Sequence, residues 1–170
     1  NLSLERLDLP SLMKLATTEE DGGDDAGLEI ESNAMLSYLN VPKLRSIENL
    51  GDGNANLYIR NNDVLTTFEF KFLQKMLAVG TRGGETFLWV DGNAMLNDYS
   101  FPSLQSVIGE EYYGAVAISD SAMLTTFSFP SLKEIGPSDF YSEFSVSECD
   151  ILEKVDKPAL RDFTYTFFSD

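Results

Sequence analysis

The most regular feature of the chain is an alternation of apolar and polar positions that returns at nearly constant intervals. Five stretches share the pattern of two apolar residues separated by one position and a leucine eight places after the first: LEIESNAML, LYIRNNDVL, LWVDGNAML, VAISDSAML and FSVSECDIL, starting at Leu28, Leu57, Leu88, Val116 and Phe144. The closing leucines, with one from a partial first copy, are 28 to 32 residues apart: Leu4, Leu36, Leu65, Leu96, Leu124 and Leu152. A period of two is typical of a strand with one buried face, and a repeat of this length is typical of a solenoid.

The repeat continues beyond each leucine into a second apolar run that usually contains a proline. Five of these prolines share one repeat position, and Lys71 fills that position in the third copy: Pro10, Pro42, Pro102, Pro130 and Pro158. No copy can bury its own apolar face, so neighbouring copies must stack. We therefore predict one all-β domain over residues 1–170, a solenoid of about six turns. Its core is predicted to contain the closing leucines and three further columns: Ile30/Ile59/Val90/Ile118/Val146, Phe70/Phe101/Phe129 and Leu73/Leu104/Leu132.

A polar column lies three residues before the closing leucines. It contains Asn1, Asn33, Asn62, Asn93, Ser121 and Cys149. Asparagine tolerates the left-handed backbone conformation, and its amide can bond to the main chain of a turn. Stacked at the strand spacing of roughly 4.8 Å, these side chains are expected to form a ladder. Cys149 is expected to be a packed thiol at the end of that column, with a reactive thiol as the alternative.

Two of the repeats carry a family likeness: LWVDGNAMLNDYSFPSLQSVIG and VAISDSAMLTTFSFPSLKEIG. This pattern resembles the receptor L-domain family, which includes the ligand-binding lobes of growth-factor and insulin receptors and lipid-anchored fungal cell-wall proteins. The resemblance spans residues 1 to about 163 and implies a right-handed β-helix related to leucine-rich repeats, with an extracellular or cell-surface location. Because Asn1 already falls in the polar column, we expect the first repeat to be truncated at its N-terminus and to leave an open edge available for edge-to-edge self-association.

Composition excludes several function classes. The 170 residues carry 12 Lys and Arg against 28 Asp and Glu, a formal charge of −16. Nucleic acids and anionic membranes require a basic footprint, so we expect neither partner, and no apolar run is long enough for membrane insertion. The chain has no histidine and one cysteine, which excludes a histidine-based triad, histidine-ligated zinc and a disulfide framework. No cofactor is predicted.

The candidate binding site lies on the outward positions of the opening strands. Alternation places Glu29, Glu31, Tyr58, Arg60, Trp89 and Asp91 there, with the two aromatic residues adjacent. Neighbouring exposed aromatics on a rigid sheet suit sugar-ring stacking or a protein hot spot. The alternative interpretation is that these aromatics only support the sheet through cross-strand contact.

Three other kinds of site remain open. Glu31 and Asp91 are expected roughly 10 Å apart, a separation that glycoside cleavage can use. An acidic loop containing Glu19, Glu20, Asp21, Asp24 and Asp25 could supply oxygen ligands to calcium, with solvated acidic surface as the simpler interpretation. Threonine pairs in two copies fit an ice-binding array, which charged residues interrupt in other copies.

These observations favour a non-catalytic recognition or adhesion module that binds protein or glycan through the outward face of the opening strands. A structural wall or stalk module without a discrete ligand is the alternative. A carbohydrate-active enzyme is the third hypothesis, and we expect that the protein is not an enzyme.

Overall fold

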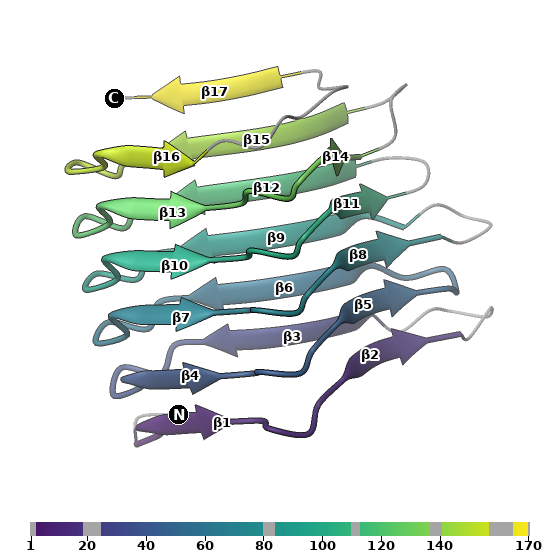
Figure 1. The fold of residues 1–170 in the computed structure, drawn as a ribbon, viewed down its shortest axis with the longest axis horizontal. Helices are drawn as coiled ribbons and strands as arrows, with labels where there is room; N and C mark the ends of the chain where they lie inside the picture. Colours follow the sequence, from purple (N-terminus) through teal and green to yellow (C-terminus); the bar gives the residue numbers. More distant parts are fainter. Residues whose placement is uncertain are drawn as a thin grey trace.

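The protein is a right-handed, all-β solenoid. The computed structural model describes residues 3–18, 25–79, 84–109, 113–136, 141–156 and 165–169. In this part of the chain the regular elements are all β-strands, and the ladders between them are parallel. Figure 1 shows the chain rising coil by coil from the N-terminus to the C-terminus, with a right-handed sense of rotation. The predicted fold class is therefore confirmed.

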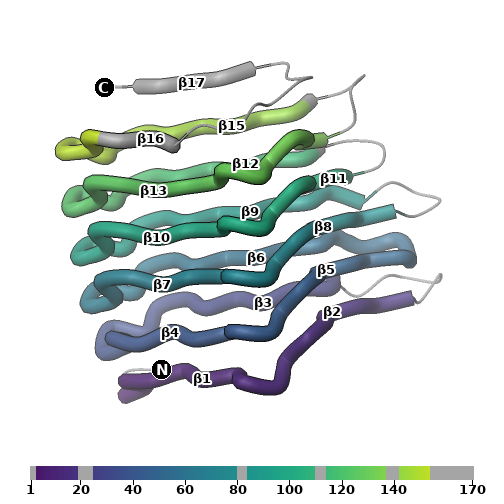
Figure 2. The backbone as a smooth tube through the Cα atoms, in the orientation of Figure 1, coloured from purple at the N-terminus to yellow at the C-terminus, as the bar shows by residue number. Residues whose placement is uncertain are grey.

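Each coil passes through three faces of the solenoid. The opening-strand sheet contains β3 (Ala26–Glu31), β6 (Ala55–Arg60), β9 (Thr86–Asp91), β12 (Tyr113–Ser119), β15 (Tyr141–Ser147) and β17 (Tyr165–Ser169). The second face contains β1 (Arg6–Asp8), β4 (Tyr38–Asn40), β7 (Thr67–Glu69), β10 (Asp98–Ser100), β13 (Thr126–Ser128) and β16 (Lys154–Asp156). The third face contains β2 (Lys14–Thr17), β5 (Ser46–Asn49), β8 (Lys75–Ala78), β11 (Ser106–Gly109) and β14 (Glu134–Ile135). The backbone trace in Figure 2 shows the bend that separates the second face from the third in the coils that have strands on both faces.

The number of complete turns is smaller than the sequence predicted. Four coils within the described residues place one strand on each face, beginning with β3, β6, β9 and β12. Within these same residues, the coil of β1 and β2 has no opening strand, and the coil of β15 and β16 has no strand on the third face. The prediction of about six turns counted these partial coils as whole ones.

The predicted core columns are confirmed. The closing leucines of the four complete coils are fully buried, as are the leucines that follow the bend: Leu36, Leu65, Leu96, Leu124, Leu73, Leu104 and Leu132. The inward residues of the opening strands expose at most 4% of their surface: Ile30, Ile59, Val90, Ile118 and Val146. Leu4, in the coil of β1 and β2, and Leu152, in the coil of β15 and β16, are partly buried and pack against this core. Stacking therefore supplies the burial that a single repeat cannot provide.

Aromatic rings form two parallel stacks inside the solenoid. In one stack Phe101 lies between Phe70 and Phe129, with ring centres 5.3 and 5.1 Å away and nearly parallel planes. In the other, Tyr99 lies between Phe68 and Phe127 at 5.0 and 5.8 Å. Offset stacking of this kind adds stability beyond the area that the rings bury.

Replacing Tyr99 by phenylalanine is expected to stabilise the protein by about 1 kcal/mol. The Tyr99 ring is 1% exposed and its hydroxyl is buried without a hydrogen-bond partner, so the folded state bears the cost of desolvating that group. Burial, together with the nearby Cys149 thiol, also raises the pKa of the phenol well above its ordinary value. Urea unfolding of the wild-type protein and the variant measures the difference in the free energy of unfolding. A variant that is less stable than the wild type by a similar amount would contradict an unpartnered hydroxyl.

The predicted polar ladder joins the turns that follow β3, β6 and β9. Asn93 donates from Nδ2 to the carbonyl oxygens of Ile59 and Asp91, at 2.8 and 3.0 Å. Its Oδ1 accepts from the backbone N–H and the side-chain amide of Asn62, at 3.1 and 3.2 Å. Asn33 continues the ladder by donating to Asn62 Oδ1. The Cys149 thiol donates to the carbonyl of Ser147 and packs against the core, which agrees with a packed thiol, and burial raises its pKa. Asn1 lies outside the described residues.

The left-handed backbone occurs one position earlier than the sequence indicated. The residues that precede the ladder column have φ between 47° and 63°: Ser32, Asn61, Gly92, Asp120 and Glu148. The ladder residues therefore serve as hydrogen-bonding groups, and their neighbours make the turn. Only Gly92 is free of the steric cost of this conformation, and a Cβ there would lie 2.4 Å from Asn61 Oδ1.

A buried carboxylate on the third face is held between two lysines. Glu48 exposes 8% of its side chain and contacts Lys14 Nζ at 2.7 Å and Lys75 Nζ at 3.0 Å. Burial by itself raises the pKa of Glu48, but hydrogen bonds from Lys14, Ser46 and Lys75 outweigh it and lower the pKa to about 2. The three coils that contribute β2, β5 and β8 are thus joined by one charge cluster.

Acidification is expected to weaken the protein through Glu48. Its unfolded pKa is near 4.5 and its folded pKa about 2, so the stabilisation is complete above pH 4.5 and is lost as the pH falls toward 2. Glu48→Gln should remove about 2–3 kcal/mol at pH 7 and flatten this part of the pH dependence. Urea midpoints between pH 2 and 7 measure both effects. If the variant lost as much stability between pH 4.5 and pH 2 as the wild type does, Glu48 would not be the source of this pH dependence.

Candidate functional site

The structure brings the six predicted residues onto one face of the opening-strand sheet. The strand register aligns Glu29 with Tyr58 and Tyr58 with Trp89. The next outward row aligns Glu31, Arg60 and Asp91 in the same way. The residues therefore form two rows across β3, β6 and β9. Glu29 and Glu31 are exposed, and the other four are half-buried.

Arg60 is the centre of this cluster. Its guanidinium lies over the Tyr58 ring at 4.7 Å and over the Trp89 ring at 5.4 Å, while Nη2 binds Glu31 Oε2 at 2.9 Å. The two aromatic rings meet edge to face, with centres 5.9 Å apart. Burial raises the pKa of Tyr58, and the charge of Arg60 opposes that rise. These contacts hold Trp89 from the β6 side and limit the rotamers that it can adopt.

A hollow opens on the other side of Trp89. Its volume is about 260 Å³, and it runs over β12 between β9 and β15. One wall, called the aromatic wall below, contains Phe87 and Trp89 together with Leu88. The floor consists of the small residues Ala115, Ala117 and Ser119. The opposite wall is polar and contains Glu143, Ser145 and Ser147. The hollow exists because the side chains of β12 are much smaller than those of β9 in the same rows.

Of the nine residues that line the hollow, only Trp89 belongs to the predicted site. Phe87, Ala115 and Glu143 lie two residues before the first outward residue that the repeat pattern identifies on each strand. They were missed because the strands begin before the first apolar position that the repeats share. Extending the period-two alternation from Trp89 back to Phe87 would have found the aromatic wall. The hollow is also displaced from the predicted site, since Glu29 and Glu31 lie on β3, beyond β6.

A second hollow of about 290 Å³ lies on the second face, between β4 and β7. Among the described strands of this face, β4 and β7 are neighbours that form no hydrogen-bonded ladder. Tyr38 lines the hollow, but the guanidinium of Arg6 already covers its ring at 3.7 Å. Its second aromatic residue, Phe68, is buried, whereas Phe87 and Trp89 are both partly exposed beside the first hollow.

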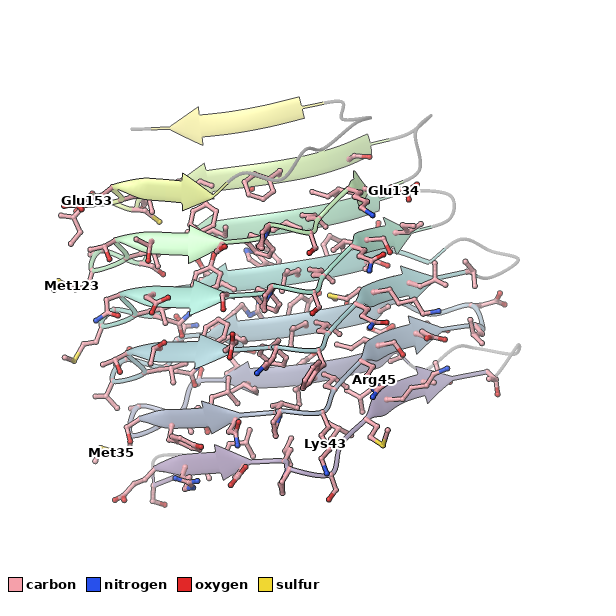
Figure 3. The ribbon with its side chains drawn as sticks, viewed as in Figure 1. Met35, Lys43, Arg45, Met123, Glu134 and Glu153 are labelled. Carbon is pink, nitrogen blue, oxygen red and sulfur yellow. The ribbon has the colours of Figure 1, made fainter. Side chains whose placement is uncertain are left out.

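Apolar side chains also form a ridge at the turns between the opening-strand sheet and the second face. Met35, Met95 and Met123 occupy the same repeat position and are each about half exposed. Figure 3 shows Met35 and Met123 at this edge of the molecule, away from Lys43, Arg45 and Glu134 on the front of the same view. Three of the four complete coils contribute one such side chain each, so the ridge follows the solenoid axis.

Of the proposed calcium loop, Asp25 is among the described residues. Glu19, Glu20, Asp21 and Asp24 lie outside the described residues, and the carboxylate of Asp25 binds the backbone N–H of Asn54 at 2.8 Å. In the described ranges no group of three or more acidic or cysteine side chains could hold a metal ion. The same residues contain no helix that is long and apolar enough to cross a membrane.

No protein-family model, curated protein or solved structure matches this chain. The resemblance to receptor L domains therefore rests on the repeat pattern alone.

Proposed function

We propose that the protein is a non-catalytic recognition or adhesion module that binds a protein or glycan through the outward face of the opening-strand sheet. The observation that carries this proposal is the hollow of about 260 Å³ beside Trp89. Concave sites that combine an aromatic wall with a few polar groups are the usual form of binding sites. An extracellular or cell-surface location is part of the proposal and rests on the receptor L-domain resemblance.

The site is preorganised, which supports a binding role. Trp89 belongs to a strand that is paired on both sides, and its ring contacts Tyr58, Phe87 and Arg60. A ligand that stacks on this ring does not have to order a loop first, so less of the interaction energy is lost on binding.

The other hypotheses fit the site less well. In the third hypothesis Glu31 and Asp91 would act as a catalytic pair, but Arg60 lies between them in the row and is ion-paired with Glu31. Asp91 accepts a hydrogen bond from the Ser119 hydroxyl. Neither carboxylate is positioned as a free acid or base. A structural module without a ligand would have no use for the hollow. The hollow does not contradict that hypothesis, but it does not support it either.

The lone tryptophan makes recognition directly measurable. We expect Trp89 emission to be red-shifted and quenched by acrylamide, and to change saturably when one class of probe is added from a panel of glycans and basic proteins. The half-buried ring on the wall of the hollow is the physical reason. Exposed emission that no probe changes would favour the structural module. Blue-shifted emission protected from acrylamide would remove Trp89 from the site.

A further inference from the structure

We propose that the hollow beside Trp89 binds a chain of uncharged sugars that lies along β12. This inference rests on the proposed recognition function and specifies the ligand of the same site. Three properties of the hollow support it: its shape, its aromatic wall and the hydrogen-bonding character of its polar groups.

The shape is that of a narrow trough. Ala115, Ala117 and Ser119 are successive outward residues of β12, so the floor is about 13 Å long at the usual rise of a strand. The walls belong to β9 and β15, the two neighbours of β12, and are roughly 10 Å apart at the usual strand spacing. A linear oligosaccharide, which is narrow and extended, matches this form better than a globular protein surface does.

The aromatic wall offers two neighbouring rings for stacking. The rings of Phe87 and Trp89 have centres 6.4 Å apart and planes inclined by 29°. Aromatic faces carry partial negative charge, and the C–H groups on the flat side of a pyranose ring carry partial positive charge. Two consecutive sugar rings in a chain can therefore rest against Phe87 and Trp89 while their hydroxyls point toward the opposite wall.

Two polar groups of the trough favour a ligand that donates hydrogen bonds. The Ser119 hydroxyl already donates to Asp91, so its oxygen faces the trough as an acceptor. Glu143 is a carboxylate on the opposite wall and accepts hydrogen bonds when ionised. Sugar hydroxyls supply the matching donors. Anionic sugars are disfavoured because their charge would meet Glu143 and a protein of net charge −16.

Binding should first be screened on an array of neutral, amino and acidic glycans, and then titrated by calorimetry. We expect neutral oligosaccharides to bind the wild-type protein. Trp89→Ala should weaken that binding at least tenfold by removing the stacking surface. Ala117→Phe should have the same effect by filling the trough while leaving the aromatic wall in place. Phe72→Ala is the matched control, because Phe72 is an exposed aromatic residue on the bend between β7 and β8. Circular dichroism and thermal unfolding verify that each variant is folded.

Several results would overturn the inference. These are the absence of any neutral glycan ligand on the array, a preference for acidic glycans, or neutral binding that folded Ala117→Phe retains in full. If an oligolysine peptide changes Trp89 emission and no neutral glycan does, the recognition function survives and the sugar assignment fails. If no glycan and no basic protein changes the emission of Trp89, both fail.

Discussion

Replacing Asn93 by alanine is expected to lower the free energy of unfolding by about 3–5 kcal/mol. Asn93 is fully buried, and its side chain makes four hydrogen bonds that join its own coil, through Asp91, to the preceding coil, through Ile59 and Asn62. Alanine would remove all four and leave buried main-chain groups without these partners. Urea unfolding monitored by circular dichroism and Trp89 fluorescence measures the loss.

Ser121→Ala is the matched control for this prediction. Ser121 occupies the same column one coil later and is also fully buried, but its hydroxyl donates a single hydrogen bond, to the carbonyl of Ser119 at 3.0 Å. We expect a loss of about 1 kcal/mol there. Similar losses at the two positions would show that the asparagine ladder adds little to the stability of the turns.

Phe101→Ala is expected to cost about 3–5 kcal/mol. Phe101 is fully buried in the middle of an aromatic stack, so alanine creates a cavity and removes the contacts of its ring with Phe70 and Phe129. The surrounding strands are fixed by their backbone ladders and can collapse only partly into that space. Chemical denaturation at pH 7 gives the free energy.

Phe72→Ala is also the control for this prediction, because it removes a phenylalanine side chain from an exposed position. An effect within about 0.5 kcal/mol is expected for such a surface change. Phe101→Ala with a comparably small effect would contradict a closely packed aromatic stack.

The stacking of the repeats could be predicted from the sequence because residues at the same repeat position are also paired in the register of neighbouring strands. Tyr58 and Trp89 occupy the same position of consecutive repeats, and the ladder between β6 and β9 places them side by side. The asparagine ladder and the stack containing Phe101 follow from the same alignment. Residues at equal repeat positions become neighbours whenever each coil closes over the one before it.

Details that depend on the ends of strands and on backbone conformation were harder to predict. Phe87 and Glu143 escaped notice because they lie before the part of each repeat that has a recognisable pattern. The left-handed position is occupied by residues as different as Gly92 and Glu148, so no single residue type marks it.

The alternation of apolar residues, the leucine spacing and the polar column together determine an all-β solenoid, its core and the face that carries Trp89, since these properties are local and recur in every copy. Only the tertiary structure decides that Arg60 pairs with Glu31, that Glu48 is held between two lysines and that a hollow opens over β12. These features arise from unlike side chains on neighbouring strands. Their sizes and charges act on one another only after the coils have stacked, and no single repeat contains that information.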